Sequence, residues 1–206
     1  MEQFMYEGPA AETDGDLPEN IPPLIVGISL VYFIVLMVGV AWCYLSDIQL
    51  MRTTELAVIG RELSWSFATG IVLVLLVSLV RWKTNVFDML EGAVRSRLGD
   101  LTRTGVFFLS LYSSVAEEIF FRGAIQTSLA SLSGSPTIGL VATSILFGML
   151  HMGRHKSYIP WTIFAVGSGL VLGYGFMVTG NILVPIFIHF LINGVNMWRI
   201  IFGAER

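Results

Sequence analysis

Two adjacent glutamates and an arginine interrupt one of the long apolar runs of this chain. The segment 114–126 reads SVAEEIFFRGAIQ, in which Glu117 and Glu118 are followed by Arg122. Within a lipid bilayer each ionisable group costs at least about 2.5–3.5 kcal/mol on insertion scales. A membrane segment keeps such groups only where they have partners or a function. This segment therefore predicts a bundle in which the other helices supply those partners.

The composition of the chain is that of a membrane protein. Of its 206 residues, 54% are hydrophobic and 13% are charged, whereas soluble domains carry about 25% charged residues. The mean hydropathy is +0.74. We therefore predict an all-α fold, a polytopic membrane helical bundle with about six transmembrane helices and one amphipathic surface helix. The sequence has no basic patch that would indicate nucleic-acid binding.

Apolar segments recur along the chain, and a membrane span needs about 20 such residues. Six segments are predicted to span the bilayer, namely 21–45, 64–80, 105–129, 137–151, 159–178 and 182–202. The polar stretch 46–63 leaves room for a short surface helix. In 85–104 apolar residues recur at spacings of three and four, with charged residues between them. This pattern predicts an amphipathic helix on the membrane surface or against the bundle.

Charge and span count divide the chain into three parts and orient it. Residues 1–20 hold six acidic residues and no basic region, which predicts a disordered tail rather than a signal peptide. Residues 21–104 form an N-terminal region with two spans, and 105–206 form a compact core of four spans. Six spans put both termini on the side that receives nine of the twelve Lys and Arg residues. The positive-inside rule then predicts that both termini are cytoplasmic.

The strongly polar residues of the core lie on three of its four spans. Glu118 and Arg122 are four residues apart, so on a helix they can form an ion pair. Glu117 is rotated from Glu118 by about 100° around the helix, so it is not expected to pair with Arg122. Two further pairs share the spacing of four residues, Phe147 with His151 and His189 with Asn193.

A glutamate, two histidines and an asparagine are a set that can carry out hydrolysis. A carboxylate in an apolar site suits a general base that deprotonates water. An imidazole can share that work, and a His/Asn pair one turn apart can present two N–H donors to a tetrahedral intermediate. The competing chemistry is zinc, with Glu117, His151 and His189 as ligands and water in the fourth position. The residues alone leave both mechanisms open.

The same residues also have structural explanations. The pair of Glu118 and Arg122 can serve only to neutralise buried charge. His151 falls at a span end beside a basic loop, as an interfacial histidine does, and Asn193 can hold helices together. His189 lies in the middle of a span, where a histidine without a role is costly, so we favour a function for it.

Other polar or reactive residues are assigned no catalytic role. Cys43 is interpreted as a thiol that faces lipid or the core, Asn196 as a packing residue, and His155 as exposed in the basic loop. Ser113 and Ser114 precede the two glutamates, but no Gly-x-Ser-x-Gly context supports a serine nucleophile there.

Three motifs, in order on successive apolar segments, resemble those of the CPBP family. They are E-E-x-x-x-R from Glu117 to Arg122, F-x-x-x-H from Phe147 to His151, and H-x-x-x-N from His189 to Asn193. This family, also called the Abi family, contains CAAX prenyl proteases and bacteriocin-processing proteins. The resemblance covers about 105–202, and 21–104 looks like the variable N-terminal helices of the family.

The resemblance implies an intramembrane endopeptidase, formerly described as a metalloprotease and now as a glutamic protease, with no cofactor. By that similarity Glu117 would activate the water with help from His151. His189 and Asn193 would line the oxyanion site. The supporting residues would be Glu118, Arg122 and Phe147.

Only two spans precede the motif block, fewer than in the larger eukaryotic relatives. This favours a compact prokaryotic member in the inner or plasma membrane over a prenyl-CAAX protease. The expected substrate is a membrane-anchored or lipid-linked protein or peptide. Two alternatives from other classes are a non-catalytic membrane immunity or scaffold protein of the same fold and a proton-coupled transporter that uses the carboxylates and histidines.

Overall fold

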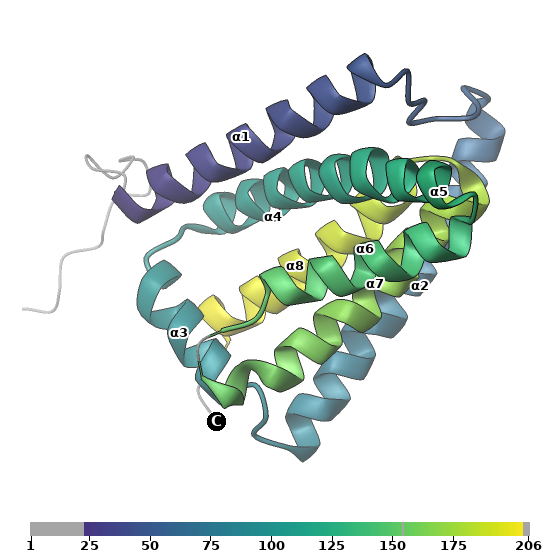
Figure 1. The fold of residues 1–206 in the computed structure, drawn as a ribbon. Helices are drawn as coiled ribbons and strands as arrows, with labels where there is room; N and C mark the ends of the chain where they lie inside the picture. Colours follow the sequence, from purple (N-terminus) through teal and green to yellow (C-terminus); the bar gives the residue numbers. More distant parts are fainter. Residues whose placement is uncertain (1–22, 154, 204–206) are drawn as a thin grey trace, which may run out of the picture.

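The computed structural model describes residues 23–153 and 155–203, so the acidic tail and Arg154 lie outside it. The described chain is helical, apart from turns and one isolated β-bridge between Met51 and Asn181 (Figure 1). The predicted all-α fold is confirmed. Its helices are α1 (Pro23–Leu45), α2 (Leu56–Lys83), α3 (Asp88–Leu98), α4 (Arg103–Glu118), η1 (Ile119–Gln126), α5 (Thr127–Ser133), α6 (Pro136–Leu150), η2 (Lys156–Tyr158), α7 (Ile159–Thr179) and α8 (Leu183–Phe202).

Five helical segments of the described chain are long and apolar enough to cross a membrane. They are Leu24–Leu45, Leu56–Lys83, Arg103–Ser133, Ile159–Thr179 and Leu183–Phe202. The remaining predicted span, 137–151, is the 15-residue helix α6, which is only about 22 Å long at 1.5 Å per residue. The five long spans and the shorter α6 make the chain an integral membrane protein.

Two boundaries differ from the sequence prediction. Helix α2 begins at Leu56, so 46–63 has no separate surface helix. The bundle accommodates the charged start of α2, because Glu62 accepts a hydrogen bond from Nδ2 of the buried Asn181 at 2.7 Å. The amphipathic helix is shorter than 85–104, because Thr102 caps a new helix, α4, by accepting from the backbone nitrogen of Gly105 at 3.1 Å.

The helix that carries the two glutamates changes its winding directly after them. Residues Arg103–Ser133 run as one continuous helical segment, but η1 within it is a π-helix. The hydroxyl of Thr127 donates to the carbonyl oxygen of Arg122, five residues earlier, at 3.1 Å. Short π-helical turns are frequent at functional sites, and this one begins immediately after Glu118.

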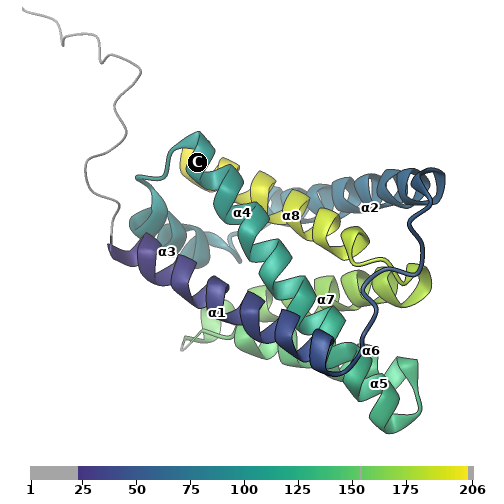
Figure 2. The same cartoon turned by 90° about the horizontal axis from the view of Figure 1, so that it is seen from above.

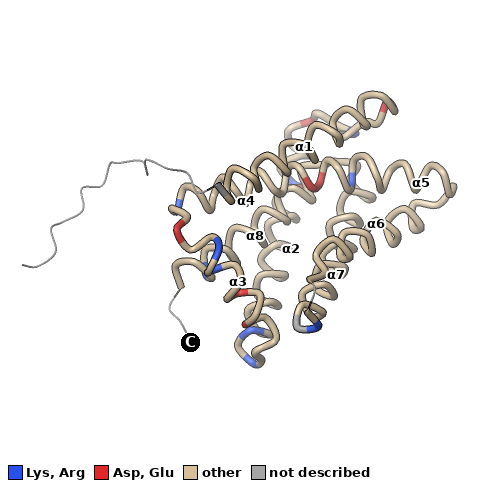
Figure 3. Tube along the Cα trace, turned by 60° about the vertical axis from the view of Figure 1, so that its left-hand side comes forward, with Lys and Arg blue, Asp and Glu red and all other residues tan. Residues whose placement is uncertain are grey.

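Several helices begin or end near α3, at one end of the bundle. Helices α1 and α4 begin beside α3, and α8 ends there, so both ends of the described chain lie on one side (Figures 1 and 2). Basic stretches concentrate near α3, at the end of α2 and at the start of α7 (Figure 3). A red stretch followed by blue between the labels α4 and α5 marks the charges of the motif helix inside the bundle.

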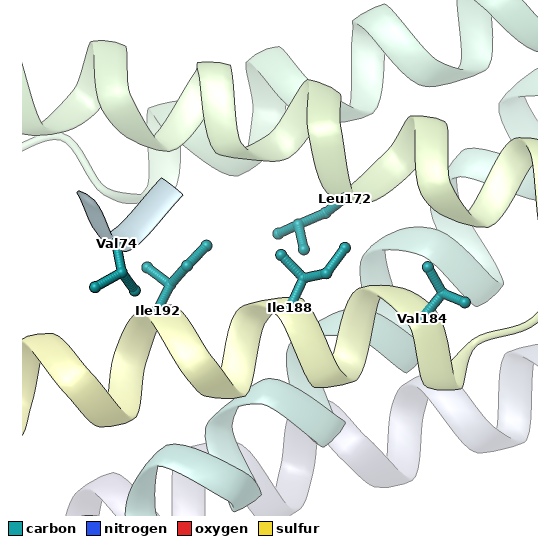
Figure 4. Packing of buried hydrophobic residues seen from close by; sticks show 5 residues of the cluster. All are labelled: Val74, Leu172, Val184, Ile188 and Ile192. Atoms are coloured by element: carbon teal, nitrogen blue, oxygen red, sulfur yellow. The ribbon is translucent and has the colours of Figure 1, made fainter. Parts of the chain in front are cut away.

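The bundle is held by close packing of α2, α7 and α8. Their buried aliphatic side chains meet in one cluster (Figure 4), consisting of Val74, Leu172, Val184, Ile188 and Ile192. Small residues let the helices approach further. A Cβ added at Gly148 of α6 would collide with the Val166 side chain of α7 and lie 3.1 Å from its backbone nitrogen. Such contacts drive helix association in lipid, where apolar burial gives little.

Candidate active site

Glu118 lies at the centre of the motif residues and is fully buried. Its Oε2 accepts a hydrogen bond from Nε of Arg122 at 2.9 Å, the ion pair that the spacing of four residues predicts. Its Oε1 accepts a second hydrogen bond from Nδ1 of His189 on α8 at 2.7 Å. The sequence did not predict this second bond. Because both oxygens are engaged by the protein, Glu118 acts as a brace between two helices.

Phe147 of α6 packs against three of the other motif residues. The guanidinium carbon of Arg122 lies 5.0 Å from the Phe147 ring centroid, within the range of a cation–π contact. The ring is 4.6 Å from the ring of His151 and 5.8 Å from the ring of His189, centroid to centroid. Phe147, which the motif predicts to be a supporting residue, therefore packs against both histidines.

His151 ends α6 and is fixed by its own helix. Its Nδ1 lies 2.7 Å from the carbonyl oxygen of Phe147. A carbonyl oxygen only accepts hydrogen bonds, so Nδ1 must carry the proton. The other nitrogen, Nε2, is then left for chemistry in the site.

Glu117 faces away from the brace and toward a cavity of about 300 Å³. His151 and Asn193 line the same cavity, as does Tyr32 from α1. The Tyr32 hydroxyl interacts with the side chains of Glu117 and Ser113. Glu117 is only 9% exposed, and its Oε2 has no hydrogen-bond partner among the described residues. The two adjacent glutamates thus have different surroundings, as their rotation around the helix predicts.

Asn193 is held in the cavity wall by a serine. Its Nδ2 donates to Oγ of Ser113 at 3.2 Å, and the Ser113 hydroxyl donates to the carbonyl oxygen of Ser110 at 3.2 Å. The neighbouring Ser114 also bonds to the Ser110 carbonyl, at 2.7 Å, and is fully buried. Ser113 therefore orients Asn193.

A second, much smaller cavity adjoins the first. It has a volume of about 20 Å³, and His151, His189 and Asn193 all line it. A polar cavity of this size holds about one water-sized group. His189 does not line the larger cavity. The structure therefore brings Glu117, His151 and Asn193 together around the larger cavity. His189 lines only the smaller cavity, and His151 and Asn193 line both.

The remaining predicted positions are found as follows. His155 is exposed, as expected for the basic loop, and Cys43 is buried in the core, 4% exposed. Asn196, interpreted from the sequence as a packing residue, lines the larger cavity with Glu117. Both polar atoms of its amide lack a partner within the described structure.

Three contributors to the site were missed in the sequence. Tyr32 comes from a helix outside the motifs, and no sequence signal separates it from other tyrosines in apolar runs. Arg81 and Glu91 close one side of the cavity with an ion pair, Nε to Oε1 at 2.6 Å and Nη2 to Oε2 at 2.7 Å. The amphipathic pattern of α3 could have indicated Glu91. It predicts that one face of this helix packs on the bundle, and residues of that face line the cavity together with Glu91.

The donor set does not fit the alternative zinc site. No group of three or more His, Cys, Asp or Glu side chains in residues 23–153 and 155–203 is arranged to hold a metal ion. Of the alternative ligands Glu117, His151 and His189, the first lines only the larger cavity and the last only the smaller one, so the three side chains do not face one common space. The mechanism proposed for this site therefore uses no metal.

Sequence comparison finds a family domain in the part of the chain that holds this geometry. A family model described as type II CAAX prenyl endopeptidase Rce1-like matches residues 101–195, which hold all three motifs. The chain carries a CPBP/Abi-family domain. This Rce1-like domain starts just before α4 and ends within α8, so α1, α2 and α3 precede it.

One relative extends the similarity beyond this domain. The chain is 29% identical over 148 residues to "Uncharacterized protein YpbD" of Bacillus subtilis (strain 168), covering 69% of this chain and 71% of that protein. No solved structure matches the chain. The CPBP resemblance that the motifs predicted is confirmed, and the matched region contains every residue assigned above to catalysis.

Proposed function

We propose that the protein is an intramembrane endopeptidase that hydrolyses a peptide bond with water activated by Glu117. One observation carries the proposal. Of two adjacent glutamates, Glu118 has both oxygens engaged, whereas Glu117 lines a cavity with His151 and Asn193 and has one oxygen, Oε2, without a partner among the described residues. A carboxylate used only for packing would have partners for both of its oxygens, because an unsatisfied buried polar group is costly.

In the first step Glu117 accepts a proton from a water molecule in the larger cavity. The water oxygen then attacks the carbonyl carbon of the substrate, and the carbonyl oxygen becomes an oxyanion. His151 orients the water through Nε2, since its Nδ1 is held by the Phe147 carbonyl. General base catalysis by a positioned side chain contributes about 10²–10⁴ to the rate.

In the second step the oxyanion is stabilised and the peptide bond breaks. Asn193 and His189 line the smaller cavity. The Asn193 amide donates an N–H to the oxyanion, and so does Nε2 of His189 in its doubly protonated form, because Nδ1–H is already bonded to Glu118. One hydrogen of the Asn193 amide is held by Ser113, and the other is available to the substrate. Glu117 returns its proton to the amide nitrogen as the carbon–nitrogen bond breaks, which leaves a carboxylic acid and an amine.

The brace positions this set. Glu118 fixes the orientation of His189, and Arg122 neutralises Glu118. These residues do not touch the substrate in the proposal.

The proposed substrate is a membrane-anchored or lipid-linked protein or peptide, because the cavity lies among membrane-spanning helices and its lining is mostly apolar. We further propose a prokaryotic inner or plasma membrane as the location, with both termini cytoplasmic. The concentration of Lys and Arg near α3, where both described ends lie, supports that orientation.

The test uses purified protein reconstituted in phospholipid vesicles. The probes are fluorescence-quenched peptides, each with an apolar anchor segment and a polar C-terminal tail. We expect cleavage of at least one peptide by the wild type and none by Glu117→Gln or Glu117→Ala. Glu55→Gln, at an exposed position before α2, is the matched control and should cleave normally.

Two results would overturn the proposal. One is full activity of Glu117→Gln, and the other is the absence of cleavage with every probe although the protein is folded. Cleavage that is lost with a chelator and restored by zinc would instead establish the metal alternative. Proton-coupled uptake into the same vesicles, lost in Glu117→Gln, would favour the transporter.

A further inference from the structure

Asn196 has no part in the mechanism above, yet it lies in the wall of the larger cavity with Glu117 and Asn193. It follows Asn193 by three positions on α8 and is the residue directly after the end of the family match. Both polar atoms of its amide, Oδ1 and Nδ2, are inaccessible to solvent and have no hydrogen-bond partner within the described chain.

This state argues against a structural role. A buried donor or acceptor without a partner destabilises the folded protein. An asparagine that holds membrane helices together needs a partner on another helix. Asn193 has such a partner in Ser113, and Arg81 is paired with Glu91 at the same cavity. Asn196 instead shares its unpartnered state with Oε2 of Glu117, the residue proposed to activate the water.

The chemistry of the amide indicates what it binds. A primary amide offers a donor and an acceptor side by side. In an extended peptide the N–H and C=O groups of one residue point in the same direction, as they do in a hydrogen-bonded pair of a β-ladder. A peptide within the hydrocarbon region must find such partners in the protein, because the bilayer core supplies no water. The unpartnered amide of Asn196 and the unpartnered backbone groups of such a peptide can therefore satisfy each other.

We propose that Asn196 binds the main chain of the substrate, for which its amide turns from its buried position into the cavity that the residue lines. Its Nδ2–H donates to the carbonyl oxygen of one substrate residue, and its Oδ1 accepts from the N–H of the same residue. This inference rests on the peptidase function proposed above and names the form of the substrate, an extended segment rather than a helix. A helix could not supply these groups, because its own backbone hydrogen bonds occupy them.

The position of Asn196 sets which substrate residue it holds. Side chains three positions apart on a helix are neighbours, with Cβ atoms about 5–6 Å apart. An extended chain advances about 3.3 Å per residue. If Asn193 is at the scissile carbonyl, Asn196 contacts a residue about two positions from the cleaved bond.

The experiment compares the wild type with Asn196→Leu, which has a similar shape and no polar atoms. The probe is a quenched peptide that the wild type cleaves, together with analogues in which an ester replaces one peptide bond at a time. In the wild type we expect one ester, about two residues from the cleaved bond, to lower kcat/KM about tenfold. In Asn196→Leu the all-amide peptide should already be about tenfold poorer, and that ester should cause no further loss.

Two controls separate substrate binding from structure. Asn85→Leu makes the same substitution at an exposed position outside the cavity lining and should leave kcat/KM unchanged. The melting temperature of Asn196→Leu should be equal to or higher than that of the wild type, because two unsatisfied groups are removed. A lower melting temperature, or the same ester effect in both proteins, would overturn the inference in favour of packing.

A binding measurement keeps this inference distinct from the peptidase proposal. The same all-amide peptide is titrated against Glu117→Gln and against Glu117→Gln with Asn196→Leu, neither of which needs to turn it over. We expect about tenfold weaker binding in the double variant. Equal binding would overturn the role of Asn196 even if cleavage depends on Glu117. Absence of any Glu117-dependent cleavage, with the tenfold difference in binding retained, would count against the peptidase proposal alone.

Discussion

The carboxylate of Glu118 accepts a hydrogen bond from Nδ1 of His189 at 2.7 Å, across the contact between α4 and α8. Its other oxygen is bonded to Arg122, one turn along its own helix. The same carboxylate therefore neutralises a buried charge and fixes which nitrogen of His189 is turned toward the smaller cavity. Structure and chemistry are coupled at this residue, and they can be separated by mutation.

Glu118→Gln should destabilise the protein strongly. The substitution leaves the guanidinium of Arg122 buried without its counter-ion, and breaking a buried ion pair in this way costs about 3–5 kcal/mol. Removing the charge as well, in Glu118→Gln with Arg122→Met, should restore part of that loss. Thermal unfolding in detergent of the wild type, both single variants and the double variant measures the coupling. Losses that simply add would show that the pair contributes nothing as a pair.

Ser113→Ala should impair catalysis with little effect on folding. Its hydroxyl holds Nδ2 of Asn193 at 3.2 Å, so its loss frees the proposed oxyanion donor to rotate. A single misplaced hydrogen bond of this kind lowers kcat by about tenfold. Ser114→Ala is the matched control, because Ser114 bonds only within its own helix, to the Ser110 carbonyl. Complete loss of activity in Ser113→Ala would instead favour a serine nucleophile.

Residue spacing predicted those parts of the site that depend on one helix. The ion pair of Glu118 and Arg122, and the different direction of Glu117, follow from 3.6 residues per turn. The order of the apolar runs likewise predicted the all-α bundle. These relationships are local, so they needed no knowledge of which helices are neighbours.

Relationships between helices could not be read from the sequence. The bond from His189 to Glu118 joins residues 71 positions apart, and the contact of Asn193 with Ser113 joins residues 80 apart. The sequence predicts a packing role for Asn196, because a lone asparagine in a span usually holds helices together. Only its place at the cavity, without a partner, distinguishes it. The π-helical turn after Glu118 has no marker in the sequence, because no proline or glycine pair starts it.

Breaking the ion pair of Arg81 and Glu91 should loosen α3 over the cavity. Both side chains are largely buried, 14% and 20% exposed, and the pair ties α3 to the end of α2. Glu91→Gln should therefore increase amide hydrogen exchange in 88–98 and leave exchange in α8 unchanged. The charge swap Arg81→Glu with Glu91→Arg should bring exchange back toward the wild type. Unchanged exchange in Glu91→Gln would show that the apolar face of α3 alone holds it in place.

Gly148→Ala should destabilise the bundle, whereas Gly167→Ala should not. A methyl group at Gly148 meets the Val166 side chain and lies 3.1 Å from the Val166 nitrogen and 3.2 Å from the carbonyl oxygen of Thr162. Backbone atoms cannot move aside without separating α6 from α7, and overpacking of this kind costs about 1–3 kcal/mol. At Gly167 nothing lies within 4 Å of the added carbon, so the better helix propensity of alanine should stabilise by about 0.5–1 kcal/mol. Thermal unfolding of the two variants in the same detergent tests both signs.

Because α6 carries Phe147 and ends at the capping residue His151, the Gly148 variant should also lose activity below its melting temperature. Equal stability of the two variants would mean that the close approach of α6 and α7 is not required.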